Sequence, residues 1–205
     1  MRREVIYDEV FDAQEQFRLI LDSMARPGKI NTLPSMDIEP PLGINKASAL
    51  IALALLNTDV SFFAEGLNSE EISDYIALNT TANLQTANLA DFIFINGLQN
   101  AEIINEAKFG NLSYPEESAT FIIGVLNISK IPIGNSLQVI LNGPGIKTSE
   151  SVFIAGISAD LLEAVKEQNL EFPLGVDLML TDLNNNLLCI PRSNQFEIIK
   201  EAVNN

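Results

Sequence analysis

Three arginines, Arg18, Arg26 and Arg192, and one glycine-containing turn are the parts of this sequence that could bind an anion. Arg26 begins the motif Arg-Pro-Gly, and Arg192 follows an Ile-Pro pair. A guanidinium group can hold a phosphate or phosphonate through two parallel hydrogen bonds, with surface ion pairing as the alternative role. Residues 142–145 read Asn-Gly-Pro-Gly, and glycines there would let backbone amides approach a phosphate. The candidate anion-binding or interface residues are Arg26, Gly28, Asn142, Gly143, Gly145, Asp177 and Arg192.

A tight structural turn is the second interpretation of residues 142–145, and the sequence favours it. The third glycine of a dinucleotide-binding fingerprint is missing, and so is the Gly-Lys-Ser/Thr ending of a nucleotide-binding loop. We expect a turn that reverses the chain sharply, with anion binding as the alternative.

Asp177 is the acidic residue that most needs a partner. It lies between Val176 and Leu178 at the start of a predicted strand, and burying a bare carboxylate there would cost several kcal/mol. Arg192 and Arg26 are the two candidate partners. The pattern favours a structural ion pair over a substrate contact, and both remain open.

Histidine is absent from the sequence, and cysteine occurs once. These two facts exclude Ser-His-Asp and Cys-His nucleophilic sites, and they remove the commonest metal ligand. Cys189 lies in the apolar run Leu-Leu-Cys-Ile, where it is expected to be a core residue. We therefore predict no catalytic residue, no metal site and no cofactor site.

The composition restricts the partners of the chain. Twenty-seven acidic and twelve basic residues give a formal net charge of −15, which would repel nucleic acid and anionic membranes. No apolar run approaches the roughly 20 residues that span a bilayer, and the first residues do not read as a signal peptide. A single cysteine fits a reducing compartment, so the cytoplasm is predicted.

The elements that must position these residues predict a mixed α/β fold. Alternating strands and helices in the first half favour a sheet with parallel pairing and helices packed on its faces. Asp12 and Glu15 have the spacing of a capping box, and Asn45 and Ser158 are expected to cap later helices. The predicted helices are 12–24, 46–56, 69–78, 98–107 and 158–168, and the predicted strands are 30–33, 60–64, 91–95, 119–126, 136–141, 152–155, 176–181 and 187–190, with the last two forming a hairpin. No repeat or biased linker divides the chain, so residues 1–205 are predicted to form a single domain.

Three segments in this order resemble the PhnH family, the H subunit of the bacterial carbon-phosphorus lyase system. The first runs from Asp-Ala-Gln at 12–14 to Met-Ala-Arg-Pro-Gly at 24–28, and the second is Asn-Gly-Pro-Gly-Ile at 142–146. The third begins with Phe-Pro-Leu-Gly-Val-Asp at 172–177 and leads to Ile-Pro-Arg at 190–192. Weaker similarity at 80–84 and 115–120 extends the match over nearly the whole chain.

The resemblance implies a role in organic phosphonate catabolism, in a complex with subunits G, I and J. The early reaction of that system transfers the ribose triphosphate part of ATP to a phosphonate and releases adenine (ribose 1-methylphosphonate 5-triphosphate synthase). The resemblance also implies a homodimer when the subunit is isolated. It further implies a fold similar to the large domain of pyridoxal-phosphate transferases, without their cofactor.

One departure from the family pattern bears on mechanism. Ser-Asn-Gln-Phe at 193–196 follows the matching arginine, where family members commonly carry a histidine-containing tail. This favours a structural or auxiliary subunit, with catalysis supplied by neighbouring subunits. The alternative is a stand-alone transferase, or a binding protein for a phosphorylated small molecule.

Overall fold

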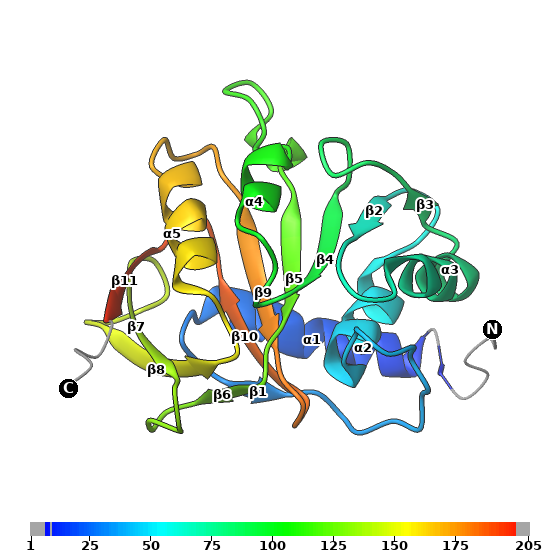
Figure 1. Cartoon of the computed structure of the whole chain (residues 1–205), viewed down its shortest axis with the longest axis horizontal. Coiled ribbons are helices and arrows are strands. Elements are labelled where there is room, and N and C mark those ends of the chain that lie inside the picture. Colours follow the sequence, from blue (N-terminus) through cyan, green and yellow to red (C-terminus); the bar gives the residue numbers. More distant parts are fainter. Residues whose placement is uncertain (1–6, 9, 200–205) are drawn as a thin grey trace.

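The computed structural model describes residues 7–8 and 10–199, which form a mixed α/β structure with two sheets (Figure 1). The larger sheet has seven strands. Their order is β1 (Asn31–Thr32), β10 (Asn186–Ile190), β9 (Asp177–Thr181), β5 (Thr120–Gly124), β4 (Phe92–Asn96), β2 (Ser61–Ala64) and β3 (Asn83–Leu84). The strands from β9 to β3 pair in parallel, whereas β10 and β1 are antiparallel to their neighbours. The predicted parallel pairing and the predicted hairpin of β9 and β10 are both present.

Helices cover both faces of this sheet because its central strands are apolar on both sides. One face packs on α1 (Phe11–Ala25), α2 (Lys46–Leu55) and α3 (Ser69–Thr80). The other packs on α4 (Glu102–Glu106), on α5 (Ala159–Gln168) and on the second sheet. Along β9, Leu178 and Leu180 belong to the second of these clusters and Met179 to the first, as alternation in a strand requires.

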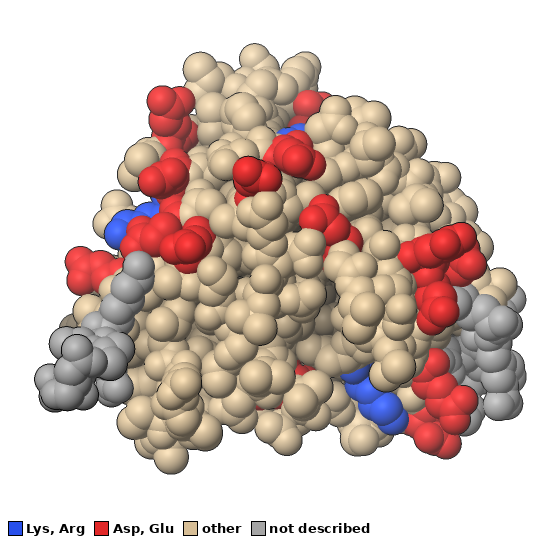
Figure 2. All heavy atoms as spheres, viewed as in Figure 1, with Lys and Arg blue, Asp and Glu red and all other residues tan. Residues whose placement is uncertain are grey.

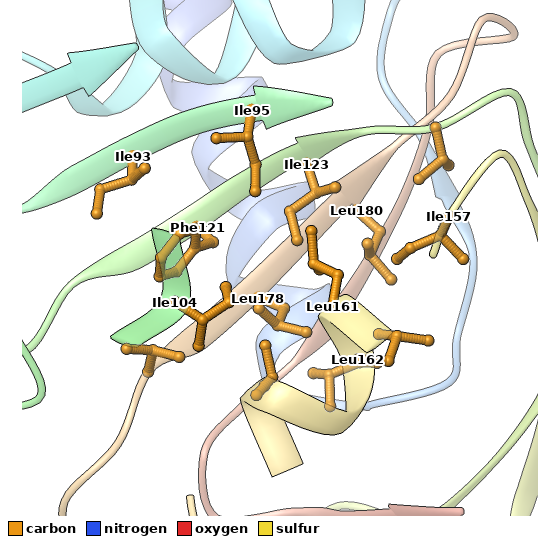
Figure 3. Close-up of a cluster of buried hydrophobic side chains, with 14 of the residues drawn as sticks. Ile93, Ile95, Ile104, Phe121, Ile123, Ile157, Leu161, Leu162, Leu178 and Leu180 are labelled. Atoms are coloured by element: carbon orange, nitrogen blue, oxygen red, sulfur yellow. The ribbon is translucent and has the colours of Figure 1, made fainter. Parts of the chain in front are cut away.

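Figure 3 shows the packing beneath α4 and α5. Ile104 of α4 and Leu161 and Leu162 of α5 face the strands. Their neighbours on β4, β5 and β9 are Ile93, Ile95, Phe121, Ile123, Leu178 and Leu180. Each fully buried aliphatic side chain of this kind stabilises the fold by about 1.5–3 kcal/mol.

The second sheet is antiparallel and was only half predicted. Its order is β11 (Gln195–Ile199), β7 (Leu137–Asn142), β8 (Glu150–Ala155) and β6 (Asn127–Ser129). The strands predicted at 136–141 and 152–155 are β7 and β8, but β6 and β11 were not predicted. β11 alternates in burial, directs Phe196 into the core and pairs with β7 as an edge strand of this sheet.

The helix ends confirm two predicted caps and correct a third. Asn45 accepts a hydrogen bond from the Ser48 amide at 2.8 Å, and Ser158 accepts one from the Asp160 amide at 3.2 Å. The predicted capping box of Asp12 and Glu15 is wrong. The helix begins at Phe11, and its N-cap residue, Val10, has no capping side chain. The Asp8 carboxylate accepts from the Val10 and Phe11 amides just before the helix, and the Asp12 carboxylate accepts from the Asp8 amide.

The helix predicted over 98–107 is shorter than expected. The Asn96 side chain accepts from the Leu98 amide at 3.0 Å, and this holds the chain in a turn before α4 begins at Glu102. A short 3₁₀ helix, η1 (Pro115–Glu117), lies between α4 and β5 in the sequence. Within residues 7–8 and 10–199, no helix is long and apolar enough to cross a membrane.

Candidate functional site

Asp177 and Arg192 form an ion pair at the open end of the β9–β10 hairpin. The Arg192 Nη2 atom lies 2.7 Å from Asp177 Oδ2, Nε lies 3.2 Å from the same oxygen, and the Arg192 amide donates to Oδ1 at 2.7 Å. The remaining nitrogen, Nη1, donates to the Pro115 carbonyl at 2.6 Å. The two side chains are only 17% and 13% exposed. Every nitrogen of the guanidinium is therefore engaged within the chain, as expected for a structural pair.

Arg26, the other candidate partner of Asp177, pairs with Asp22 instead. Both lie at the end of α1, four residues apart. Lys29 also contacts the Asp22 carboxylate, at 2.6 Å, and Asn31 donates to it at 2.9 Å. The hydrogen bonds from Lys29 and Asn31 hold the pKa of Asp22 below its usual value, so this carboxylate is charged at neutral pH.

The turn at residues 142–145 is held from two sides. Asn194 donates from Nδ2 to the carbonyls of Asn142 and Pro144, at 3.2 and 3.0 Å. Gly145 has φ +82°, and a Cβ atom there would lie 2.5 Å from the Ala25 carbonyl oxygen. The glycine is therefore required by the close approach of the corner after α1.

The first two segments that carry the family resemblance meet in space, and the residues just after the third segment contact them. The corner at 25–28 contacts the turn at 142–145, and that turn contacts residues 193–194, which follow Arg192. A Cβ atom on Gly28 would lie 2.6 Å from Glu150 Cβ, so β8 joins the same junction. The structure does not bring Arg26, Asn142 and Arg192 into one anion-binding pocket, because Arg192 faces Asp177 and Pro115 at the other end of the junction.

Arg26 and Gly145 line a cavity of about 510 Å³ beside this junction. Three lysines that the sequence analysis did not select lie in its wall: Lys29, Lys130 and Lys147. Lys29 and Lys147 could have been found, because they follow Arg26 and Gly145 by three and two residues. Lys130 precedes β7 along the chain and gives no local signal.

A larger cavity of about 900 Å³ lies at the carboxyl ends of β4 and β5. Its walls are the loop at 37–46, residues 96–98 after β4, residues 124–126 after β5, and Gly156 and Leu183. The carboxyl ends of parallel strands are where open α/β sheets commonly bind ligands. Sequence analysis missed it because its walls come from five segments that are separate in the sequence. On the face shown in Figure 2, acidic side chains outnumber basic ones, and the lower middle carries few charges.

Cys189 is completely buried in β10, as predicted. Burial raises the pKa of its thiol, and the nearby Asp177 charge raises it further. The thiol is therefore neutral and unreactive in the folded chain. In the part of the chain that the structure describes, no group of three or more Cys, Asp or Glu side chains could hold a metal ion.

A family model and two known proteins match this sequence over most of its length. The model of the family described as "Bacterial phosphonate metabolism protein (PhnH)" matches residues 5–197, which include all three junction segments. The chain belongs to the PhnH family. It is 30% identical over 192 residues to the "Alpha-D-ribose 1-methylphosphonate 5-triphosphate synthase subunit PhnH" of Rhizobium meliloti (strain 1021), covering 93% of this chain and 92% of that protein.

A second relative of this PhnH family chain comes from Stutzerimonas stutzeri. It is named "Putative C-P lyase subunit protein HtxG" and is 26% identical over 185 residues, covering 90% of this chain and 86% of the relative. Both relatives are named as subunits. The family resemblance expected from the sequence is confirmed.

Proposed function

We propose that this chain is an auxiliary, non-catalytic subunit of a carbon-phosphorus lyase complex. In this role it supports transfer of the ribose triphosphate part of ATP to a phosphonate, with release of adenine. The family match and the names of both relatives support a subunit of this system. Its partners are subunits G, I and J, it forms a homodimer when isolated, and it acts in the cytoplasm.

The observation that carries the auxiliary role is that Arg192 and Asn194 make their hydrogen bonds within the chain. Arg192 gives its donors to Asp177 and Pro115, and Asn194 gives its amide to the turn at 142–145. Each guanidinium nitrogen of Arg192 and both amide hydrogens of Asn194 are engaged in this way, so these side chains hold segments of the chain together. Such a junction supports a scaffold that presents a fixed surface to other subunits.

Co-expression with subunits G, I and J of the same organism tests the role. An affinity tag on this chain should retain the other three in a stoichiometric complex, and untagged chain should retain none. If tagged, folded chain fails to retain them, the proposal is wrong.

A variant pair separates scaffold from catalysis. Arg192→Ala should lower the yield of complex, and the complex that does assemble should keep its turnover per molecule. Arg18→Ala, which removes an exposed arginine on α1, is the matched control and should change neither quantity. A fully assembled Arg192→Ala complex without turnover would contradict the auxiliary role.

A stand-alone transferase is the second candidate function, and the cavity with Arg26 and three lysines favours it. Incubation of the purified chain with ATP and methylphosphonate tests it by chromatography of released adenine. We expect no release above the rate without protein. Sustained release by the chain alone would replace the auxiliary role with the transferase.

A further inference from the structure

Four cationic side chains from three separate segments surround the cavity beside the junction. Arg26 and Lys29 come from the corner after α1, Lys130 from the loop after β6, and Lys147 from the chain after the turn at 142–145. We call this cavity, of about 510 Å³, the basic cavity. Its walls also include Thr148 and Glu150.

The concentration of positive charge is unusual for this chain. The whole sequence has twelve basic residues and a net charge of −15, yet four of the twelve line this one cavity. Asp22 pairs with Arg26 and Lys29, and Glu150 pairs with Lys130. Four cations with two carboxylates leave a local excess of two positive charges, against the overall sign of the molecule.

Lys147 is the cation most available to a ligand. It is exposed and has no ion pair among the described residues. Lys130 and Glu150 are each nearly half exposed, so water screens their pair, which contributes little stability. An anion could therefore take Lys130 as a partner at small cost.

The fold keeps the cavity in shape. Gly28 and Gly145 both adopt positive φ and allow the corner after α1 to approach β8 and the turn at 142–145 within contact distance. The cations are thus carried by segments that are fixed against one another, which reduces the entropy lost when they converge on a ligand.

We propose that the basic cavity binds a small polyanion through its phosphoryl or phosphonyl oxygens, with Arg26, Lys29, Lys130 and Lys147 as its cationic partners. The volume suits a small molecule. Lysine and arginine are the residues that recognise such oxyanions. The proposal concerns the isolated chain and does not depend on its assembly with other subunits.

Calorimetric titration of the full chain with inorganic triphosphate tests the proposal. We expect one site per chain, with an affinity that falls as sodium chloride is raised. Orthophosphate and methylphosphonate, titrated separately, distinguish phosphoryl from phosphonyl ligands, and binding of either supports the shared chemistry. If titration with triphosphate, orthophosphate and methylphosphonate at low salt releases no heat of binding, the proposal is overturned.

Three variants locate the site. Lys147→Gln should weaken triphosphate binding by about two- to fivefold, the range of one exposed ion pair. Glu150→Gln should tighten it by about the same factor, because it removes a negative charge from the wall and frees Lys130. Lys46→Gln is the matched control, since Lys46 is also exposed and has no ion pair among the described residues, but lines the larger cavity at the carboxyl ends of β4 and β5.

Two results would overturn the assignment even if binding is observed. Equal losses in Lys147→Gln and Lys46→Gln would show attraction to the protein at large, and a loss in Lys46→Gln alone would place the ligand in the other cavity. A short poly-glutamate peptide is the remaining probe. Tighter binding of this peptide than of triphosphate would make the cavity a docking site for an acidic protein segment instead.

Discussion

Arg192 joins three parts of the chain that are far apart in sequence. It follows β10, pairs with the first residue of β9 and donates to Pro115 just before β5. Because the pair is mostly shielded from water, loss of one partner leaves the other poorly solvated. The sequence offered Arg192 as one of two candidate partners, because Asp177 and Arg192 lie at the two ends of one predicted hairpin. It could not predict the contact with Pro115, which depends on how η1 packs against the hairpin.

Arg192→Ala should lower the free energy of unfolding by about 3 kcal/mol, the lower end of the range for breaking a buried pair. Urea denaturation followed by circular dichroism measures the change. Arg18→Ala should stay within about 0.5 kcal/mol of the original chain, as is usual for an exposed position. Equal effects of the two substitutions would show that the ion pair contributes nothing beyond an ordinary surface arginine.

At the scale of elements, local sequence signals predicted most helices and the central strands. The strands that were not predicted depend on contacts between residues far apart in the sequence. The helix at 46–55 was evident from its cap and apolar surface, and the hairpin from its polar turn. β11 was missed because it follows a proline and gains its place only by pairing with β7, more than fifty residues earlier. The candidate site followed the same pattern: the glycine turn was recognised, but its contact with the corner after α1 was not.

The turn at 142–145 gives a test of that contact. Gly145→Ala should be destabilising by clearly more than about 1–2 kcal/mol, the cost of left-handed backbone for a residue with a side chain, because the new methyl group would also collide with the Ala25 carbonyl. Gly134→Ala is the control. Gly134 also has positive φ, but no atom lies within 4 Å of a Cβ built there, so only the backbone cost applies.

Thermal unfolding of both variants measures the difference. A melting temperature that falls equally for the two alanine variants would mean that the neighbouring corner moves aside without cost. The junction would then be less rigid than the described contacts indicate.

At the scale of the whole molecule, charge is the dominant property. Acidic residues exceed basic ones by fifteen, and the basic residues that exist are partly gathered in one cavity. Composition predicts that the molecule as a whole repels other polyanions. It could not reveal the basic cavity, because a net charge carries no information about which residues the fold brings together.

Salt should therefore stabilise this chain at neutral pH. Raising sodium chloride from about 0.1 M to about 1 M shortens the screening length from about 10 Å to about 3 Å and weakens repulsion among the carboxylates. We expect the melting temperature to rise at pH 7, and to rise less near the isoelectric point of about 4.2. A salt effect of the same size at both values would mean that charge repulsion is not its cause.

The seven-stranded sheet ends on both sides in a strand of only two residues, β1 and β3. A long edge strand exposes a row of unpaired amides and carbonyls to which strands of other molecules can add, which leads to fibrils. An edge strand of two residues exposes very few such groups. The sheet is therefore poorly suited to extension by a strand from a foreign polypeptide. Surfaces of this fold can therefore be exposed to a partner with little risk that the sheet edges polymerise.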